Sequence, residues 1–253
     1  MPTVYVIGGP NGAGKTTVAL RLFPDVLASK EFVNADFIAK GLSAFDTESV
    51  AYAAGRLLLQ RIHELKTRGK DFAFESTLAS RSFVPFLREC KQEHYNITLI
   101  YVWIEGADLA RQRIRERVAQ GGHSIPDEVI RRRYERSIAN LVNLYLPLAD
   151  SWRIYDNTLA TPRLVAFKDV ESSVTTFLPE RMEKIMSSQV REPQEEYVPN
   201  KIDRAVIAAV AEELERKRKL GLPIVIGRDG KVVIMIGDKV VEEIEYGSLE
   251  KRK

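Results

Sequence analysis

A glycine-rich segment near the start of the chain carries residue types that bind nucleotide phosphates. Residues 9–16 read Gly-Pro-Asn-Gly-Ala-Gly-Lys-Thr, which matches the P-loop pattern GxxxxGK(S/T) in full. Glycines leave backbone N–H groups free to wrap around phosphates, Lys15 can reach the terminal phosphates, and the Thr16 hydroxyl can bind Mg²⁺. We therefore predict a nucleotide site formed by Gly9, Asn11, Gly12, Ala13, Gly14, Lys15, Thr16 and Thr17, with Thr16 as the metal ligand.

The sequence on either side of this motif supports the interpretation. Residues 3–7 are apolar and mostly β-branched, as in a buried parallel strand, and residues 15–23 have helical character up to Pro24. The alternative is a glycine-rich turn that binds nothing. A lysine, a threonine, a strand and a helix all in register argue against that alternative.

Other motifs decide the class of P-loop protein, because GTPases, motor ATPases, helicases and kinases share this cradle. The GTPase letters N-K-x-D recur at residues 200–203, but they follow Pro199 in a polar stretch, and no D-x-x-G precedes them after the P-loop. We interpret that match as chance. Oligomeric ATPases usually carry two acids after an apolar strand, whereas residues 97–104 are followed by Glu105-Gly106. Of the classes of P-loop protein considered, this leaves the small-molecule kinases.

A kinase needs a carboxylate that orients or deprotonates the accepting hydroxyl group. Asp36 is the best candidate, because it lies in Asn34-Ala35-Asp36 just past the second predicted strand. Strand ends on the P-loop side of an open α/β sheet converge on the ligand crevice. The alternative is that Asp36 only caps a following helix or makes a turn.

Positive charge is concentrated in one part of the chain. Residues 111–136 hold eight arginines against four acidic residues, although the net charge of the whole chain is only +3. This segment is expected to bind an anionic ligand. A solvated helix face or a nucleic-acid patch would show the same charge pattern.

Six short pieces within residues 1 to about 165 stand in the order of one known family. They are Gly8-Gly9-Pro10-Asn11-Gly12-Ala13-Gly14-Lys15-Thr16-Thr17, Asn34-Ala35-Asp36, Phe74-Glu75-Ser76-Thr77-Leu78, Arg117-Val118 followed by Gly121-Gly122-His123, Arg132-Arg133-Tyr134 with Arg136-Ser137 and Asn140-Leu141, and Tyr155-Asp156-Asn157. Together they resemble the zeta toxin family of P-loop kinases. Its studied members phosphorylate the sugar 3'-hydroxyl of UDP-N-acetylglucosamine with ATP and Mg²⁺.

The resemblance implies roles for residues at the matching positions. Asp36 would be the catalytic base, and Glu75 and Thr77 would hold the acceptor or the metal shell. Arg117 and one of Arg132 or Arg133 would neutralise the phosphoryl group, which suits the planar, permanently charged guanidinium. The predicted catalytic set is therefore Asp36, Lys15, Arg117 and Arg132, and the predicted substrate contacts are Asp36, Glu75, Thr77 and Arg133.

Some of these residues have simpler explanations when each is taken alone. Glu75 would be a surface acid, and the run of arginines at residues 131–133 would be a solvated helix face. Asn157 is predicted to contact the nucleotide beside the adenine site, although a turn after a strand explains it equally well. His123 could contact substrate, but a hydrogen bond that shapes its loop is the favoured interpretation.

Cysteine and histidine usage excludes two kinds of site. Cys90 is the only cysteine, and with Phe83, Phe86 and Leu87 it forms an apolar pattern at helical spacing. We interpret it as a buried small hydrophobe and not as a reactive thiol. One cysteine and three histidines give no support for a dedicated zinc site.

Strands and helices alternate along the first 190 residues. Strands are predicted at residues 3–7, 31–33, 71–74, 97–104, 152–155 and 164–167, the last at a sheet edge. Helices are predicted at residues 15–23, 47–68, 83–93, 107–120, 127 to 141 or beyond with Asp127 as its cap, and 179–188. This alternation predicts an α/β fold of the P-loop kinase type, a parallel sheet with helices on both faces, for a kinase domain at 1–190.

The remaining residues differ from the first 190 in composition and in their pattern of predicted elements. Residues 191–202 are polar and are interpreted as a linker. Residues 203–253 predict a small α+β appendage, which consists of a helix at 203–220 and a three-stranded meander at 224–226, 232–236 and 240–244. A meander of this size is too small to be very stable, so we expect it to pack on the main domain or on a partner chain.

The bulk composition is that of a folded protein. The chain has 253 residues, of which 45% are hydrophobic and 29% charged, so disorder is not expected to dominate. Its start has no basic segment followed by a long apolar run, and we expect a cytoplasmic protein.

These observations predict an ATP- and Mg²⁺-dependent kinase that phosphorylates a hydroxyl group of a nucleotide sugar or a similar anionic metabolite. Two alternatives stay open, a kinase of polynucleotide ends or of another metabolite, and a regulatory module that binds nucleotide without turnover. The resemblance also implies an antitoxin as a protein partner. The family's antitoxin is typically a separate small helical protein, and none is visible in this chain.

Overall fold

The computed structural model of the chain describes residues 1–26, 31–119, 125–159, 161–187, 215–216, 218–228 and 231–245. These residues divide between two compact units, Met1–Pro193 and Gln194–Lys253. The predicted linker at 191–202, residues 203–214 of the predicted helix, His123 and the N-K-x-D match all lie outside the described residues.

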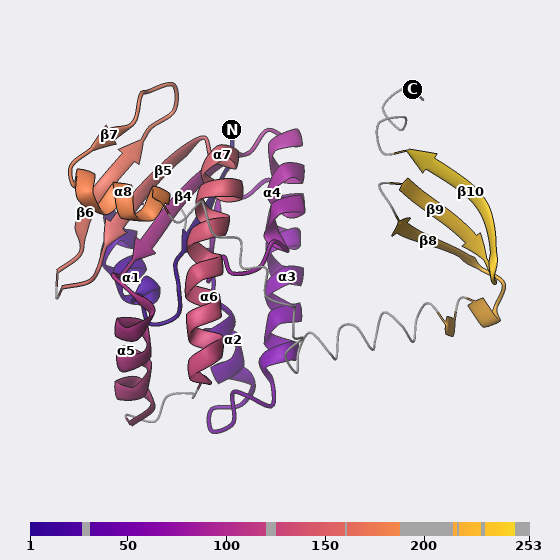
Figure 1. Cartoon of the computed structure of the whole chain (residues 1–253), viewed down its shortest axis with the longest axis horizontal. Helices are drawn as coiled ribbons and strands as arrows, with labels where there is room; N and C mark the ends of the chain where they lie inside the picture. The colour runs from indigo at the N-terminus through magenta and orange to yellow at the C-terminus, as the bar shows by residue number, and fades with distance from the viewer. Residues whose placement is uncertain are drawn as a thin grey trace. The chain divides into compact units, whose positions relative to one another are not determined.

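A seven-stranded sheet forms the centre of the first unit (Figure 1). Its spatial order is β2-β3-β1-β4-β5-β6-β7, and β1 to β5 are parallel while β6 and β7 run antiparallel to their neighbours. The strands are β1 (Thr3–Gly8), β2 (Phe32–Val33), β3 (Phe72–Ser76), β4 (Asn96–Trp103), β5 (Ser151–Asp156), β6 (Arg163–Lys168) and β7 (Thr175–Thr176). This arrangement confirms the predicted α/β fold of the P-loop kinase type.

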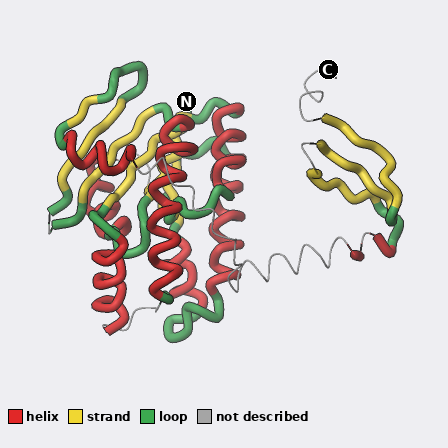
Figure 2. The backbone as a smooth tube through the Cα atoms, in the orientation of Figure 1, coloured by secondary structure: helices red, strands yellow, loops and turns green. Residues whose placement is uncertain are grey.

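Helices cover both faces of the sheet, as the near-continuous apolar strands require (Figure 2). On one face α3 (Ala51–Thr67), α4 (Phe83–Gln92) and the end of α6 (Asp127–Asn140) pack on the large core that contains Val4, Phe72, Phe74 and Leu99. On the other face, α1 (Lys15–Val26) and α5 (Ala107–Ala119) pack on Ile7, Ile100 and Val102. Alternate residues of one strand therefore face different cores.

The carboxyl ends of the parallel strands lie at one edge of the sheet. β1 is followed by the P-loop, β2 by Asn34, and β3 ends at Ser76, which pairs in register with Gly8. Because parallel strands end on the same side, residues far apart in sequence meet there. This edge is the place where the predicted site residues can gather.

Two predicted helix details are wrong. α1 does not stop before Pro24 but runs to Val26, so that Pro24 stands in its last turn. Asp127 is not the cap of α6, since Pro126 holds that position. The Asp127 carboxylate lies in the first helical turn and pairs with Arg115 of α5 at 2.6 Å.

Two elements were not predicted as such. α2 (Ala35–Leu42) follows β2 directly and contains Asp36. β7 pairs with β6, with Phe167 opposite Thr175, so β6 is not the edge strand that its sequence suggested. β7 is two residues long and exposed, and such a short polar segment carries no periodicity that would reveal it.

The last helices close the first unit. α6 continues into the π-helix η1 (Leu141–Tyr145) and then into α7 (Leu146–Leu148), so the predicted continuation past residue 141 is confirmed with a change of helix type. α8 (Pro179–Ser187) buries Ile185 against the sheet. None of the helices within the described ranges has the length and apolar character needed to cross a membrane.

The second unit contains the predicted meander. Strands β8 (Pro223–Arg228), β9 (Lys231–Ile236) and β10 (Lys239–Glu245) form an antiparallel sheet in the order β10-β9-β8. The register shifts between Val240 and Glu242, as at a β-bulge.

The buried thiol of Cys90 gives a direct test of the fold. Cys90 is fully buried in α4, and burial raises the pKa of its thiol to about 12. We predict that iodoacetamide at pH 8 does not modify the native protein and modifies it fully in denaturant, because only the thiolate reacts. Mass spectrometry of both samples checks this. Modification of the native protein at the rate of the denatured one would contradict the buried position.

Candidate active site

The P-loop is held in a conformation that only glycine can adopt at three positions. Gly9, Gly12 and Gly14 have φ angles of +146°, +76° and +81°. A Cβ atom on Gly9 would lie 2.3 Å from the Val102 carbonyl oxygen, and one on Gly12 would lie 2.7 Å from that of Ala110. The loop is therefore pressed against β4 and α5, and its backbone is free of side chains where phosphates would lie.

Lys15 is buried at the carboxyl edge of the sheet, with 8% of its surface exposed. Its Nζ donates to the Pro10 carbonyl oxygen at 3.2 Å and lies 3.6 Å from Oε1 of Glu75. Burial lowers the pKa of Lys15, and the positive charge of Arg117 lowers it further. The carboxylates of Glu75 and Asp36 act in the opposite direction. The charges of Asp36 and Arg117 therefore both act on the P-loop lysine.

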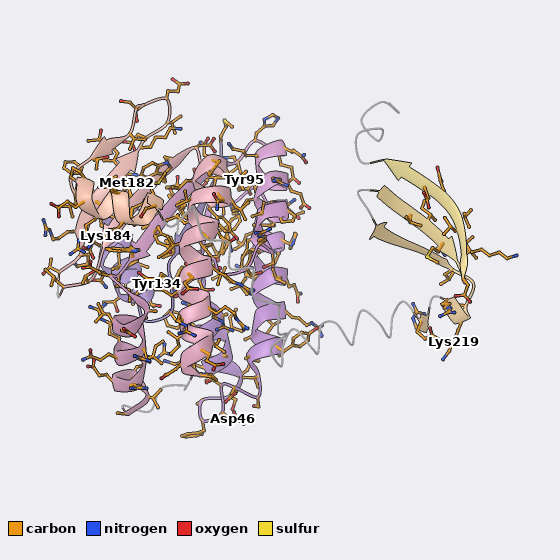
Figure 3. The ribbon with its side chains drawn as sticks, in the orientation of Figure 1. Asp46, Tyr95, Tyr134, Met182, Lys184 and Lys219 are labelled. Carbon is orange, nitrogen blue, oxygen red and sulfur yellow. The ribbon has the colours of Figure 1, made fainter. Side chains whose placement is uncertain are left out.

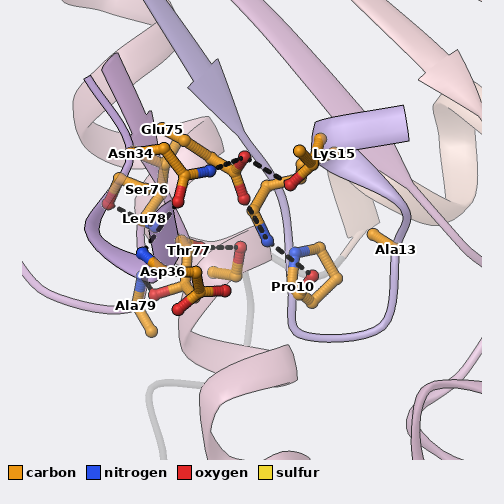
Figure 4. A network of polar contacts seen from close by, with 12 residues as sticks. Pro10, Ala13, Lys15, Asn34, Asp36, Glu75, Ser76, Thr77, Leu78 and Ala79 are labelled. Atoms are coloured by element: carbon orange, nitrogen blue, oxygen red, sulfur yellow. Dashed lines mark hydrogen bonds and ion pairs between the residues drawn. The ribbon is translucent and has the colours of Figure 1, made fainter. Parts of the chain in front are cut away.

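Glu75 is the centre of the polar network drawn in Figure 4. Its Oε2 accepts hydrogen bonds from the Thr16 hydroxyl and from Nδ2 of Asn34, each at 2.7 Å. One carboxylate therefore joins the first turn of α1 and the end of β2 at the carboxyl end of its own strand, β3.

Asp36 does not cap the helix that contains it. That task belongs to Asn34, whose Oδ1 accepts from the backbone N–H groups of Asp36 at 2.8 Å and Phe37 at 3.1 Å. The Asp36 side chain is exposed and lies on the same side of the network as Thr77 (Figure 4). The capping alternative for Asp36 is therefore wrong, and its carboxylate is exposed.

Thr16 and Glu75 fit a magnesium ion. They present hydroxyl and carboxylate oxygens 2.7 Å apart beside the phosphate cradle, and Mg²⁺ prefers such oxygen ligands. No group of three or more His, Cys, Asp or Glu side chains that could hold a metal occurs among the described residues. An ion at Thr16 and Glu75 would thus take its other oxygens from phosphates and water, which is how Mg²⁺ is usually bound in kinases.

The arginines of the segment at residues 111–136 have different partners. Arg111 and Arg115 pair with Asp127 and fasten α5 to α6. Arg113 donates from both Nη atoms, at 2.9 Å each, to the backbone carbonyls of Asn157 and Thr158. Arg111, Arg113 and Arg115 therefore have structural partners that the spacing in sequence did not reveal.

The predicted phosphate-binding arginines are on α5 and α6. Arg117 lies in the last turn of α5 and is exposed. Arg132 and Arg133 lie in the second turn of α6 and are half-buried, whereas Arg131 is exposed. The run at 131–133 is thus not a uniformly solvated helix face.

Asn157 holds the P-loop itself. Its Nδ2 donates to the Ala13 carbonyl oxygen at 2.7 Å, and a Cβ atom on Gly14 would lie 2.6 Å from this nitrogen. Its backbone N–H donates to the Trp103 carbonyl oxygen at 2.8 Å. Asn157 therefore connects the cradle to the end of β4, a role that the sequence did not suggest.

Glu105, two residues past the end of β4, forms ion pairs with side chains of α8. Its carboxylate pairs with Arg181 and with Lys184, which Figure 3 labels, and these pairs hold the pKa of Glu105 below its ordinary value. The Arg181 guanidinium also lies over the Trp103 ring at 5.6 Å and 3.3 Å from Oδ2 of the buried Asp156. Glu105 thus has structural ion pairs that fasten α8 to the end of β4.

This fold and this cradle define a P-loop protein, and the sequence comparison agrees. The AAA domain family matches residues 4–140, more than half of the chain, and the chain belongs to that family. A similar protein of Haemophilus influenzae, described as uncharacterized, is 29% identical over 126 residues, which are 50% of this chain and 88% of that protein.

Solved structures share the fold at low sequence identity. A chain from the crystal structure of AvrRxo1-ORF1:-ORF2 with ATP matches with a TM-score of 0.60 and 17% identity, over 85% of this chain and 73% of that one. A chain from the PezAT chromosomal toxin–antitoxin system of Streptococcus pneumoniae matches with a TM-score of 0.52 and 15% identity, over 85% and 87%. The second likeness agrees in fold with the resemblance to zeta toxins.

Glycine at position 9 can be tested against a glycine that has open space. We predict that Gly9→Ala destabilises the protein by about 2 kcal/mol and abolishes binding of a fluorescent ATP analogue, because the backbone is strained and the Val102 carbonyl is in the way. The matched control is Gly55→Ala in α3, where no atom lies within 4 Å. It is expected to keep binding and to gain up to about 1 kcal/mol. Equal binding by both variants would contradict the assignment of the cradle.

Proposed function

We propose that the protein is a kinase that transfers the γ-phosphoryl group of ATP to a hydroxyl group of a small anionic metabolite. The observation that supports this most is the network at the carboxyl edge of the sheet. Lys15 and Thr16 of the cradle share the Glu75 carboxylate, and the charges of Asp36 and Arg117 reach Lys15. A cradle, an exposed carboxylate and a guanidinium are the parts that phosphoryl transfer needs.

In the proposed reaction the hydroxyl oxygen of the acceptor attacks the γ-phosphorus atom. The bond from that phosphorus to the oxygen bridging to the β-phosphate breaks, and ADP leaves. The proton of the hydroxyl passes to the Asp36 carboxylate. Lys15 and the guanidinium of Arg117, with Arg132 in the same role, offset the negative charge on the moving group. Arg133 and Thr77 are proposed as contacts to the acceptor.

Binding of the nucleotide requires a change of partners at Lys15. Its Nζ now faces Glu75 and the Pro10 carbonyl, and it would turn to the phosphate oxygens. The Glu75 carboxylate would then stand beside phosphates of the same charge sign, which is unfavourable. Mg²⁺, when bound at Thr16 and Glu75, supplies the positive charge that removes this repulsion.

The proposed acceptor is a nucleotide sugar such as UDP-N-acetylglucosamine. This part rests on the resemblance of the six sequence pieces to zeta toxins. The same resemblance, together with the toxin–antitoxin system named for the PezAT neighbour, supports a separate antitoxin-like protein as a partner.

Replacement of Asp36 tests the reaction. With ATP, Mg²⁺ and UDP-N-acetylglucosamine, we predict that Asp36→Asn lowers formation of phosphorylated product at least about 100-fold, because the amide cannot take the proton. Binding of an ATP analogue should not change, since the side chain lies outside the cradle. Chromatography of the product and a binding titration measure the two effects.

The control variant for Asp36→Asn is Asp108→Asn. Asp108→Asn removes an exposed carboxylate of α5, whose side chain is 91% exposed, and should leave turnover intact. Turnover of another hydroxylated metabolite, with none of the nucleotide sugar, would keep the kinase and refute the acceptor. Phosphorylation of an oligonucleotide end would favour a polynucleotide kinase. Binding without turnover of any acceptor would refute the kinase in favour of a regulatory module.

We further propose that residues 1–193 carry the whole activity. All the site residues named above lie in the unit Met1–Pro193. We predict that a chain ending at Pro193 phosphorylates the acceptor with a kcat within about twofold of the full chain, since it retains every charge that acts on the phosphates. Side-by-side steady-state kinetics check this. A loss of more than tenfold, with the shortened chain still folded by circular dichroism, would assign the second unit a part in catalysis.

A further inference from the structure

The segment after β3, residues 77–80, has a strained backbone. Leu78 has a φ of +55°, in the left-handed region that side chains with a Cβ rarely adopt. Its side chain is fully buried, and a Cβ atom on Gly8 would lie only 2.5 Å from its Cδ1. Such strain persists only where the surrounding structure enforces it, and it is concentrated at functional sites.

Three side chains from one helical stretch enforce this conformation. The Ser137 hydroxyl donates to the Thr77 carbonyl oxygen at 2.6 Å, Nδ2 of Asn140 donates to that of Leu78 at 2.8 Å, and the Tyr145 hydroxyl donates to that of Ser80 at 2.8 Å. All three side chains are buried, and the Tyr101 hydroxyl of β4 lies 2.8 Å from Ser137 Oγ. These donors satisfy carbonyls that the strained turn cannot pair within itself.

The π-helix explains how these side chains share one face. The backbone N–H of Leu146 donates to the Leu141 carbonyl oxygen, five residues back, so the helix absorbs one extra residue in this turn. With that residue discounted, positions 137, 140 and 145 correspond to i, i+3 and i+7, which is the stripe on one side of an α-helix. In an uninterrupted α-helix, Tyr145 would lie about 80° around the helix axis from Ser137 and about 140° from Asn140.

We propose that Ser137, Asn140 and Tyr145 are positioning residues for acceptor binding. They hold the turn at residues 77–80 directly after Glu75, whose carboxylate lies 3.6 Å from Lys15, and they join that turn to the helix that bears Arg132 and Arg133. The functional consequence rests on the proposed kinase activity. The structural part, that these donors hold the turn, stands on its own contacts.

The experiment uses the full chain and removes single hydroxyl groups. Tyr145→Phe and Ser137→Ala each delete one donor to the turn and leave the remaining packing in place. The matched control is Tyr95→Phe. Tyr95 is also a buried tyrosine whose hydroxyl donates to backbone carbonyls, those of Lys66 and Lys70, at 3.0 and 3.2 Å. It lies at the end of the unit where the N-terminus is, away from the carboxyl edge of the sheet (Figures 1 and 3).

The first readout is amide hydrogen exchange, which needs no substrate. The amides of Leu78, Ala79 and Ser82 bond to side-chain oxygens within this turn. Loss of one donor should speed exchange in peptides covering residues 76–82 about fivefold, the effect of one ordinary hydrogen bond, and leave the P-loop peptide unchanged. Unchanged exchange, or the same acceleration at residues 76–82 in Tyr95→Phe, would overturn the proposal.

The second readout separates positioning from general stability. With ATP and UDP-N-acetylglucosamine, Tyr145→Phe should raise KM for the acceptor about fivefold and leave KM for ATP unchanged, while Tyr95→Phe changes neither. An equal rise of both KM values in Tyr145→Phe would overturn a role specific to the acceptor. If the wild-type chain phosphorylates no acceptor, the kinase proposal fails by that result, and the exchange data alone decide whether the three residues hold the turn.

Discussion

The Glu75 carboxylate is the group on which the arrangement of this site depends. It lies at the end of a buried strand and satisfies donors from two other segments, the Thr16 hydroxyl and the Asn34 amide, while Lys15 lies 3.6 Å away. Burial lowers the pKa of Lys15, and the negative charge of Glu75 acts against this effect. Glu75 thus joins Lys15 and Thr16 of the cradle to Asn34 at the end of β2.

The rest of the first unit supports this constraint. Parallel strands bring the P-loop, Asn34 and Glu75 to one edge, and the strand order places β1 between β3 and β4. Asn34 has two roles, since its amide nitrogen serves Glu75 and its amide oxygen starts the helix that displays Asp36. On the other side of the cradle, Asn157 fixes the Ala13 carbonyl. Asn34 and Asn157 each lie just past the end of a strand, and Glu75 is the second-last residue of β3.

Much of the fold could be predicted because its signals are local. Apolar runs identify the parallel strands, and the glycine pattern identifies the cradle. Contacts between distant segments left no local signal, so the roles of Asn34, Arg113 and Asn157 were invisible in the sequence. Arg111 and Arg113 look alike in a charge count, yet one pairs with Asp127 and the other holds backbone carbonyls. Only the relative placement of α5, α6 and the end of β5 distinguishes them.

The contact between Gly8 and Leu78 has a consequence for how related sequences can vary. The two residues lie on neighbouring strand ends, and the leucine side chain fills the space that a side chain at position 8 would need. A Cβ atom at position 8 would lie 2.5 Å from Cδ1 of Leu78 and 3.0 Å from the Tyr101 ring. A relative with alanine or serine at the position of Gly8 should carry a smaller side chain at the position of Leu78, so the two columns of an alignment should change together.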